Sequence, residues 1–435
     1  MKEIISGFSK KSKEEKAQWL AQTFASDPEK AMALFKTYTH PNPEIQEIHD
    51  EFIENTLANY YLPFAIAPNF LIDEKVYAVP MVIEESSVVA AASKAAKFWL
   101  DKGGFHTEIV GTEKVGHVHL NYYGDPKQLF AFFDAHREAF MQGLKPLSAS
   151  MEKRGGGIRS LELVDKPAAL DGYYHIALTF ETKDAMGANF INSCLEQLAQ
   201  DFRLKAQEAF KADEAPEVVM SILSNYVPNC VVRAWVRCPI EQLGYEGVEG
   251  AEFATKFCRA VAIAQAEPYR AVTHNKGIMN GIDAVVIASG NDFRAVEAGV
   301  HAYASRDGHY RSLTKAEITP DQELHFELEV PLALGTVGGL TALHPMVKLA
   351  LDLMDHPSAE DLMKITAVAG LAQNFGAVSS LVTTGIQKGH MKMHLLNLLN
   401  AEGASASEKE TLTAHFKDKT VSSAAVKEAL SHLRQ

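Results

Sequence analysis

The sequence predicts a mixed α/β fold with more than one domain. The chain has 435 residues, 47% of them hydrophobic and 22% charged, which is typical of a globular protein with a sizeable core. Strand and helix patterns alternate within 109–217, and two short helical patterns end the chain. We therefore expect a large domain formed by 1–108 and 218–384, an inserted small domain over 109–217, and a C-terminal flap over 385–435.

Local signals predict the elements of the first hundred residues. Ser12 and Glu15 have the spacing of a capping box, and an apolar stripe at helical spacing follows them. A second helical stretch is expected up to about Tyr60. Residues 65–82 have a strand-like pattern, and 87–100 are alanine-rich and helical.

The break at Gly103-Gly104 precedes the small domain. The patterns that follow predict, in order, strands within 107–121, a helix at 126–142, a glycine run at 155–157, a strand at 174–180 and a helix at 189–211. The segment contains no G-x-G-x-x-G, so the Rossmann fingerprint is absent.

The second half of the large domain continues the mixed pattern to about residue 350. Ser358 and Asp361 then mark the start of a long helix. Small residues at 403–407 predict a hinge, so the helical segment behind it is a candidate lid.

The segment 181–199 is the most informative part of the chain. An alternating strand precedes it, Asp184 occupies the expected position of a helix N-cap, and Gly187 permits a close backbone approach. A strand, a turn with glycine and a helix N-terminus form an anion site suited to pyrophosphate. An ordinary capped helix with a permissive glycine would give the same pattern.

Five sequence blocks resemble the class II, bacterial-type 3-hydroxy-3-methylglutaryl-coenzyme A (HMG-CoA) reductases, in the order of that family. The first is DAMGAN, which is similar to the family's dinucleotide-binding motif and comprises Asp184, Ala185, Met186, Gly187, Ala188 and Asn189. The others are PMVIEESSVVAAAS at 80–93, RGGG at 154–157, THNKGIMNGIDAVVIASGND at 273–292 and GLAQNFGAVSSLVTTGIQKGHM at 370–391.

This resemblance implies a fold and an activity. The small domain would be a ferredoxin-like sheet with helices that binds the dinucleotide. The enzyme would interconvert HMG-CoA with mevalonate and coenzyme A in the mevalonate pathway of isoprenoid synthesis, using two molecules of NADPH or NADH. Family members form homodimers, or hexamers built as trimers of dimers, with active sites at the subunit interface. A cytoplasmic protein is expected.

Four residues carry the chemistry that the resemblance implies. Thioester reduction needs a group that stabilises negative charge on oxygen, a proton for the leaving thiolate and an acid for the aldehyde step. The family match assigns these roles to Lys276, His390 and Glu85, with Asp292 between the lysine and the glutamate. Without it, Lys276 would be a surface lysine and Asp292 an N-cap. One of Glu84 and Glu85 is expected to be buried and able to act as an acid, and the alternative is a pair of acids at a helix N-terminus.

The resemblance also assigns the binding residues. Ser87 and Arg270 would hold the distal carboxylate of the substrate, and Asn225 and Asn280 would lie near the lysine. The adenosine ribose would lie beside Lys153 and Arg154, and these cations favour NADPH. Glu152, pointing inward, would instead read the ribose hydroxyl and favour NADH.

Composition limits the alternatives. The net charge of −13 and the lack of a basic stripe argue against nucleic-acid binding. The charged N-terminus is unlike a signal peptide, no uncharged apolar stretch of about 18 residues is apparent, and no metal-binding pattern is present. The four cysteines are expected to be buried thiols rather than disulfides, which suits a reducing compartment. They are Cys194, Cys230, Cys238 and Cys258.

Two other functions agree less well with the sequence. A non-catalytic acyl-coenzyme A binding or sensing protein on the same fold would have lost at least one of the four catalytic residues, and all four are present. A reductase with a cysteine nucleophile would need a cysteine in a polar, glycine-rich setting, which none of the four has. Two departures from the family pattern, Ala58 in ENTLA and Ser86 after Glu85, concern local backbone detail.

Overall fold

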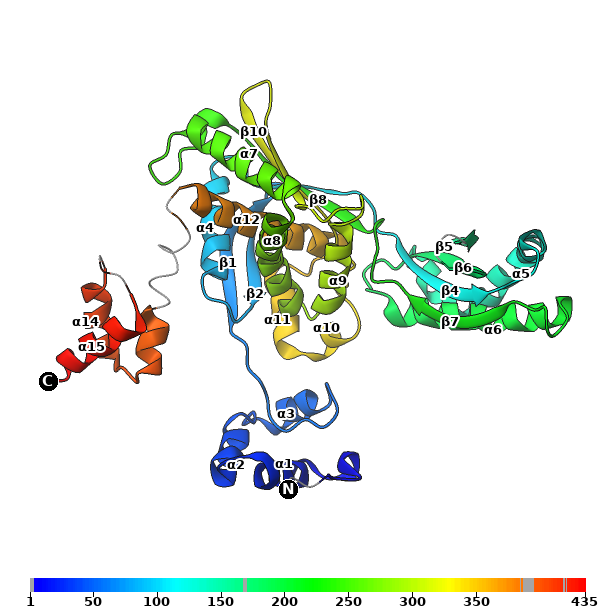
Figure 1. Ribbon diagram of the computed structural model, residues 1–435, viewed down its shortest axis with the longest axis horizontal. Helices are drawn as coiled ribbons and strands as arrows, with labels where there is room; N and C mark the ends of the chain where they lie inside the picture. The colour runs from blue at the N-terminus through cyan, green and yellow to red at the C-terminus, as the bar shows by residue number, and fades with distance from the viewer. Residues whose placement is uncertain (1–3, 167–169, 384, 386–394, 418, 420) are drawn as a thin grey trace.

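The structure is a computed structural model that describes residues 4–166, 170–383, 385, 395–417, 419 and 421–435. It has the expected mixed α/β architecture (Figure 1). A central body carries a sheet-and-helix unit on one side, a helical unit at the N-terminus and another at the C-terminus. Three separate hydrophobic clusters correspond to the central body, the small domain and the C-terminal unit.

Three helices form the N-terminal unit: α1 (Lys13–Phe24), α2 (Pro28–Thr37) and α3 (Pro43–Asp50), after a 3₁₀ turn (Phe8–Lys10). The predicted capping box at Ser12 and Glu15 is confirmed, with both reciprocal hydrogen bonds present. The expected single helical stretch up to Tyr60 is wrong. A proline at the first position of α2 and of α3 starts each as a separate helix, and no helix follows between Asp50 and β1.

The large domain consists of a β-hairpin, a four-stranded sheet and the helices around them. The hairpin is β1 (Phe64–Ile72) and β2 (Lys75–Val82), and the sheet has the order β3-β8-β10-β9 with antiparallel neighbours. The sheet strands are β3 (His106–Ile109), β8 (Val231–Pro239), β9 (Thr314–Ile318) and β10 (Glu323–Pro331). The helices are α4 (Val88–Leu100), a 3₁₀ turn (Ile240–Gln242), α7 (Gly250–Ala266), α8 (Pro268–Ala288), α9 (Phe293–Tyr303), α10 (Leu340–Leu343), α11 (Pro345–Leu353) and α12 (Ala359–Val382).

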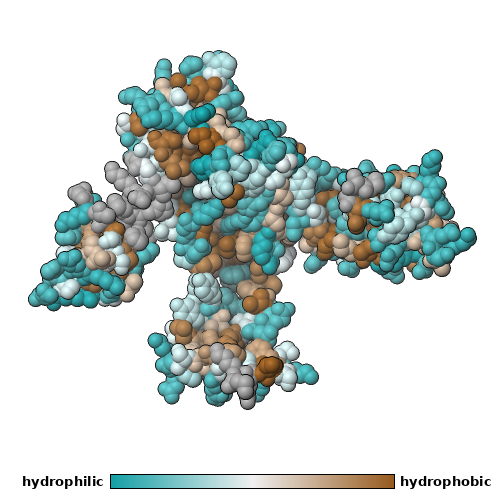
Figure 2. Space-filling model, in the orientation of Figure 1, coloured by the Kyte–Doolittle hydropathy of each residue, from teal (hydrophilic) through white to brown (hydrophobic). Residues whose placement is uncertain are grey.

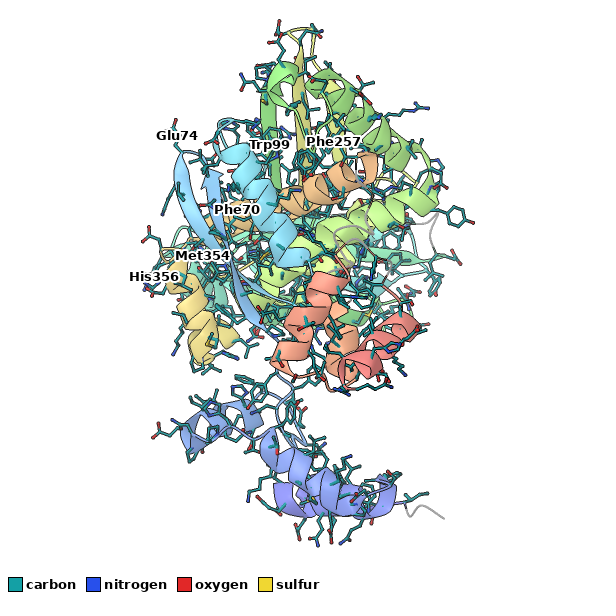
Figure 3. The ribbon with its side chains drawn as sticks, turned by 90° about the vertical axis from the view of Figure 1, so that its left-hand side faces the viewer. Phe70, Glu74, Trp99, Phe257, Met354 and His356 are labelled. Carbon is teal, nitrogen blue, oxygen red and sulfur yellow. The ribbon has the colours of Figure 1, made fainter. Side chains whose placement is uncertain are left out.

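Helix α12 is the centre of the large-domain core. It packs against α4, α7 and α8 and against the β8 face of the sheet. Its Phe375 ring contacts those of Trp99 and Phe257, which lie beside α12 in Figure 3. The predicted capping box of Ser358 and Asp361 is confirmed. This helix is long and apolar enough to cross a membrane, contrary to the sequence reading, but 72% of its most apolar window is buried inside the protein.

The small domain has β-α-β-β-α-β order and the sheet order β5-β6-β4-β7, so the ferredoxin-like expectation is confirmed. Its strands and helices are β4 (Lys114–Asn121), α5 (Pro126–Glu152), β5 (Gly157–Asp165), β6 (Tyr173–Glu181), α6 (Ala188–Ala209) and β7 (Glu217–Leu223). Because β7 pairs with β4, the small sheet extends to Leu223, past the boundary expected at 217.

Two sequence predictions for this domain need correction. The strand signals within 107–121 belong to β3 and β4, which lie in different sheets. The helix predicted at 126–142 continues to Glu152 despite Pro146, because Leu144, Ser148 and Met151 extend its buried stripe at helical spacing.

Two neighbouring segments connect the small domain to the large one. The outgoing segment lies between β3 and β4, and the returning segment lies between β7 and β8. The N–H groups of Val110 and Gly111 both donate to the carbonyl of Val231, and the N–H of Val231 donates back to Gly111. Farther along, the N–H of Glu113 donates to the carbonyl of Asn229. The two segments therefore form one hydrogen-bonded, two-stranded ribbon.

The C-terminal unit contains a helix over 395–401, α14 (Ala406–His415) and α15 (Ser423–Leu433). The two predicted terminal helices are confirmed. The hinge expected at 403–407 is instead a turn between two helices, because Ser405 caps α14 and apolar residues on both sides of the turn share one cluster. That cluster comprises Leu395, Leu399, Ala404, Leu412, Phe416, Val426 and Leu430.

Candidate active site

An ion pair joins two of the predicted catalytic residues. The Nζ of Lys276, on α8, lies 2.6 Å from Oε2 of Glu85, in the turn between β2 and α4. The side chain of Lys276 is 59% exposed and that of Glu85 is 39% exposed. The expectation that Glu84 or Glu85 is buried is wrong in this single chain, since both lie exposed in the turn.

Buried polar residues on α8 hold Lys276 in place, and the sequence reading missed them. The amide of Asn275 donates to the carbonyl of Arg311 and accepts from the N–H of Leu313, at 2.9 and 3.0 Å. His274 bonds to Thr314 at 2.6 Å, and burial lowers the pKa of His274 to about 3, so its ring is neutral. The THNK sequence itself was the available signal, since polar residues there precede a strongly apolar stretch.

Asp292 is the N-cap of α9, as the alternative reading of this residue predicted. Its Oδ1 accepts from the N–H groups of Arg294 and Ala295, and the Arg294 guanidinium binds both carboxylate oxygens at 3.0 and 3.1 Å. Burial raises the pKa of Asp292, but the hydrogen bonds from Arg294 and Ala295 outweigh burial and hold it below its ordinary value. Within the described part of the chain, Asp292 makes no hydrogen bond or ion pair with Lys276 or Glu85.

The other predicted substrate residues lie on α8 and at the start of α4. Asn280 is one turn beyond Lys276 and on the same face of α8. Ser87 begins α4 with a left-handed φ of 77°. Arg270 is in the first turn of α8, six residues before Lys276, so the two side chains leave the helix about 120° apart. Within a single subunit, the side chains of Arg270 and Lys276 therefore project in different directions from α8.

Arg270 has the character of a binding residue for an anion. Burial lowers the pKa of its guanidinium, and within the described ranges this group makes no ion pair. The Glu267 carboxylate lies nearby but bonds to the backbone N–H of Arg270, at 2.7 Å. A half-buried guanidinium that forms no ion pair can bind a substrate carboxylate through two parallel hydrogen bonds.

The expectation that Asp184 caps α6 is wrong. The helix starts at Ala188 with Gly187 as N-cap. Asp184 instead accepts from the N–H of Ala359, the first residue of α12, at 2.8 Å, and its carbonyl accepts from Thr336 at 2.8 Å. The partner that overrides the local pattern is 175 positions away in sequence.

The start of α6 nevertheless has the features of an anion site. Gly187 has a φ of 92°, and a Cβ there would lie 2.5 Å from Cγ2 of Thr182, so both the backbone and the space require glycine. Because glycine has no capping side chain, the first N–H groups of α6 are left for a ligand. Ala188 and Asn189 provide the first two of these groups. Free N–H groups at a helix N-terminus are a common binding site for phosphate groups.

The cations expected near the adenosine ribose lie at the end of α5. Lys153 and Arg154 are exposed there, and the guanidinium of Arg154 contacts the carbonyl of Ser150 at 3.3 Å. Glu152 accepts a hydrogen bond from the Ser148 hydroxyl of its own helix. This contact occupies one oxygen of the acid that would otherwise read the ribose.

A narrow pocket lies between the large domain and residues 184–189, the dinucleotide loop expected from the sequence. Met186 and Ala188 of the loop line it together with Asn225, which follows β7, and Ala295 on α9. Ala295 also donates its N–H to Asp292, so the pocket lies next to the helix turn that Asp292 caps. The dinucleotide loop and Asn225 thus line the same pocket.

The four cysteines are free, as predicted, and three are fully buried. Burial raises the pKa of Cys194 to about 12 and those of Cys230 and Cys258 to about 11. Thiols this weakly acidic are poor nucleophiles at neutral pH, which argues against a cysteine mechanism. His390, the predicted thiolate acid, lies outside the described residues.

Comparisons with known proteins agree with this arrangement. The family model described as hydroxymethylglutaryl-coenzyme A reductase matches residues 12–395. A 3-hydroxy-3-methylglutaryl-coenzyme A reductase of Archaeoglobus fulgidus is 34% identical over 435 residues, which are 100% of this chain and 95% of the relative. A probable reductase of the same name from Borreliella burgdorferi is 34% identical over 358 residues, 81% of this chain and 79% of the relative.

Solved structures show that the similarity extends from the sequence to the fold. The reductase of Streptococcus pneumoniae matches with a TM-score of 0.73 and 37% identity, covering 99% of this chain and 100% of that one. A structure of the same organism's class II enzyme, described as bound to NADPH in open conformations, matches with a TM-score of 0.72, 37% identity, and coverage of 87% and 100%. The chain therefore belongs to the hydroxymethylglutaryl-coenzyme A reductase family and is of the class II type.

Proposed function

We propose that Lys276, Glu85, Asp292 and His390 form the catalytic centre of this HMG-CoA reductase. The protein reduces HMG-CoA to mevalonate and coenzyme A in the mevalonate pathway, an activity that its family membership establishes. The observation that supports the residue assignment best is the 2.6 Å pair of Lys276 and Glu85. In this proposal, the oxyanion stabiliser and the proton donor would lie within one hydrogen bond of each other.

The chemistry divides into two reductions. NADPH, when bound, supplies a hydride to the thioester carbon and a second molecule supplies one to the aldehyde carbon. Lys276 stabilises the negative charge that grows on the carbonyl oxygen in each step. The carbon–sulfur bond breaks between the two steps, and His390 gives the departing coenzyme A thiolate its proton. Glu85 delivers the proton that the aldehyde oxygen takes up, and Asp292 modulates the charges of this network.

Binding of the substrate would use residues around the same centre. Arg270 and Ser87 would hold the distal carboxylate of HMG-CoA, and Asn225 and Asn280 would bind polar groups near the reacting carbonyl. The half-buried guanidinium of Arg270, which forms no ion pair within the described residues, supports its role. Because Arg270 and Lys276 diverge around α8, Arg270 fits the active site of a partner subunit better than that of its own chain.

Assembly as a homodimer, or as a trimer of dimers, would complete the site. Large apolar side chains remain exposed on the central body and the N-terminal unit (Figure 2). Those on α8, α9 and the α10–α11 region are Tyr269, Val272, Phe293, Leu340, Leu343, Met346, Leu349 and Leu353. Analytical ultracentrifugation would detect the assembly, and a monomer at micromolar concentration would contradict it. A cytoplasmic location fits the free thiols.

NADPH is the cofactor, and we infer that the enzyme prefers it to NADH. The exposed Lys153 and Arg154 supply positive charge for a 2′-phosphate, while Glu152 bonds to Ser148. The test is kcat/KM for each cofactor at one ionic strength, because salt screens contacts to phosphate. A ratio favouring NADH would overturn the inference and identify Glu152 as the discriminating residue.

One assay tests the proposed function against its alternative. Purified protein with HMG-CoA and NADPH should oxidise two molecules of NADPH for each mevalonate formed, as measured by absorbance and by mass spectrometry of the product. Binding of HMG-CoA without NADPH oxidation would instead support a sensing protein on the same fold. Lys256→Ala is a suitable control variant, since Lys256 pairs with Glu252 on the surface of α7, away from these residues.

A further inference from the structure

Lys114 is a buried lysine at the start of β4 that the proposed chemistry does not use. Its exposed fraction is 5%. The ammonium donates to the hydroxyl of Thr182 and to the carbonyl of Ala185, the latter at 3.1 Å. Within the described ranges it forms no ion pair with a carboxylate, and burial lowers its pKa. The carboxylates of Glu181 and Asp184 attract this charge without forming an ion pair, so the direct hydrogen bonds of the ammonium go to neutral oxygens of the turn before α6.

The hydrogen bonds of Lys114 fix the dinucleotide loop. Thr182 is fully buried and donates to the same carbonyl of Ala185, at 2.6 Å, while it accepts from Lys114. Thr182 also lies under Gly187, where it leaves no room for a Cβ atom. Lys114, Thr182 and Ala185 therefore form a closed polar cluster at the turn that leads into α6.

The large domain holds the opposite side of this loop. Asp184 is fastened to Thr336 and Ala359 through the two 2.8 Å hydrogen bonds described above. A Cβ on Gly335 would lie 2.3 Å from the backbone nitrogen of Met186, so the two loops are in close backbone contact. The dinucleotide loop is thus clamped between Lys114 on the small domain and these groups on the large domain.

Lys114 also brings charge to the binding pocket. It lines the narrow pocket that Met186 and Ala188 also line, and it borders a second pocket on the side of Asp184, which Glu181 lines as well. A lysine ammonium has three N–H donors, and its two hydrogen bonds leave one. The positive charge lies beside the turn that opens α6, where an anion would bind.

We propose that Lys114 is a positioning residue for the dinucleotide. It fixes the backbone of the loop through Ala185 and adds positive charge next to the N-terminus of α6. This inference rests on the proposed NADPH site, but it concerns binding alone and not the reduction of HMG-CoA. A merely structural lysine would affect folding stability and leave the affinity for the dinucleotide unchanged in the folded protein.

The test measures the dissociation constants of NADPH and HMG-CoA separately, with the melting temperature, in the full-length protein. Lys114→Met keeps the length of the side chain and removes its charge. We expect its dissociation constant for NADPH, followed by nucleotide fluorescence, to rise at least about tenfold, since charged hydrogen bonds are the strong ones. The constant for HMG-CoA, followed by calorimetry, should stay within about twofold.

A matched control and a second pair of variants make the result decisive. Lys205→Met removes a charge from the exposed face of α6, where Lys205 pairs with Glu208, and should leave NADPH binding unchanged. If Lys114→Met does not fold, Thr182→Val and Thr182→Ser answer the same question, because only the serine keeps the hydroxyl that links Lys114 to Ala185.

The outcomes separate this inference from the proposed function. Weakened NADPH binding in Lys114→Met or Thr182→Val, with normal binding in Thr182→Ser and Lys205→Met, would support the inference whether or not the protein turns HMG-CoA over. An unchanged NADPH constant in folded Lys114→Met would overturn it. An equal loss for HMG-CoA would also overturn it, because the effect would then be a general disturbance of the fold.

Discussion

The Nζ of Lys276 and the Oε2 of Glu85 lie 2.6 Å apart although 191 positions separate them in the chain. Both side chains are more than a third exposed, so solvent screens the pair and its contribution to stability is small. The pair therefore contributes little to folding. In the proposed catalytic centre it would let a proton pass directly between the residue that stabilises the oxyanion and the residue that acts as acid.

Replacing Lys276 should separate catalysis from stability. We expect Lys276→Ala to lower kcat by on the order of 10²- to 10³-fold for both HMG-CoA and mevaldehyde, because the charge on oxygen grows in both reductions. The melting temperature should change little, since the pair is exposed. Steady-state kinetics with each substrate check this, and a kcat within tenfold of wild type would refute the role of Lys276.

Arg294 should influence the pH below which activity falls, through its effect on the pKa of Asp292. The guanidinium of Arg294 contributes to holding the pKa of Asp292 below its ordinary value against the effect of burial. In Arg294→Met that pKa should rise, so Asp292 becomes protonated at a higher pH. If the reaction needs the ionised carboxylate, the acid limb of the kcat/KM profile moves to higher pH.

The same variant has a linked effect on stability. A carboxyl group with a lowered folded-state pKa stabilises the protein above its unfolded pKa, and this contribution is lost as the pH falls through the folded value. Arg294→Met should therefore be less stable than wild type at neutral pH, and this difference should disappear as the pH falls below the folded-state pKa of Asp292. Arg137→Met, which breaks a similar exposed pair with Asp134, is the control. Identical pH profiles for the Arg294 variant and wild type would exclude the coupling.

His390 should matter for only one of the two reductions. His390→Gln is expected to block reduction of HMG-CoA and to spare reduction of mevaldehyde, because only the first substrate expels a thiolate that needs a proton. Rates with the two substrates, measured side by side, provide the test. Equal losses would mean that His390 has a more general role.

Removing residues 385–435 should leave a folded but inactive protein. The C-terminal unit has its own apolar cluster, so its deletion uncovers none of the buried residues around α12. We expect the truncated protein to melt cooperatively and to bind NADPH, but not to reduce HMG-CoA, because it lacks His390 and the proposed lid. Retained turnover would contradict the assignment of this segment as a lid.

Local patterns predicted the elements that local interactions stabilise. The capping boxes at Ser12 and Ser358 are complete within a few residues of sequence, and both are present. The alternation within 107–121 correctly indicated strands, but the same pattern cannot tell that β3 and β4 pair with different partners. The sheet to which a strand belongs depends on hydrogen bonds to strands far away in sequence. The local pattern of a single sequence does not identify those partners.

The candidate site shows the same limit. Asp184 has the local pattern of a cap for α6, and it bonds instead to Ala359 of a distant helix. Family resemblance brought out Lys276 and Glu85, whose pairing no spacing rule could have predicted. Lys114 went unnoticed, since a lysine at the start of an alternating strand resembles any surface residue until the fold buries it.

Because a two-stranded ribbon connects the domains, the small domain could be removed or exchanged as a single unit. The chain leaves the large domain at Val110 and returns at Val231, and these two residues are hydrogen-bonded to each other. If the small domain were deleted, the two chain ends left in the large domain would therefore be adjacent. A short loop could join them, and another ferredoxin-like module could be transplanted onto the same two strands. The connection also defines how the domains can move, since paired strands bend together and resist sliding past each other. Recombination at these two points would exchange the small domain while leaving Lys276 and Glu85 in place.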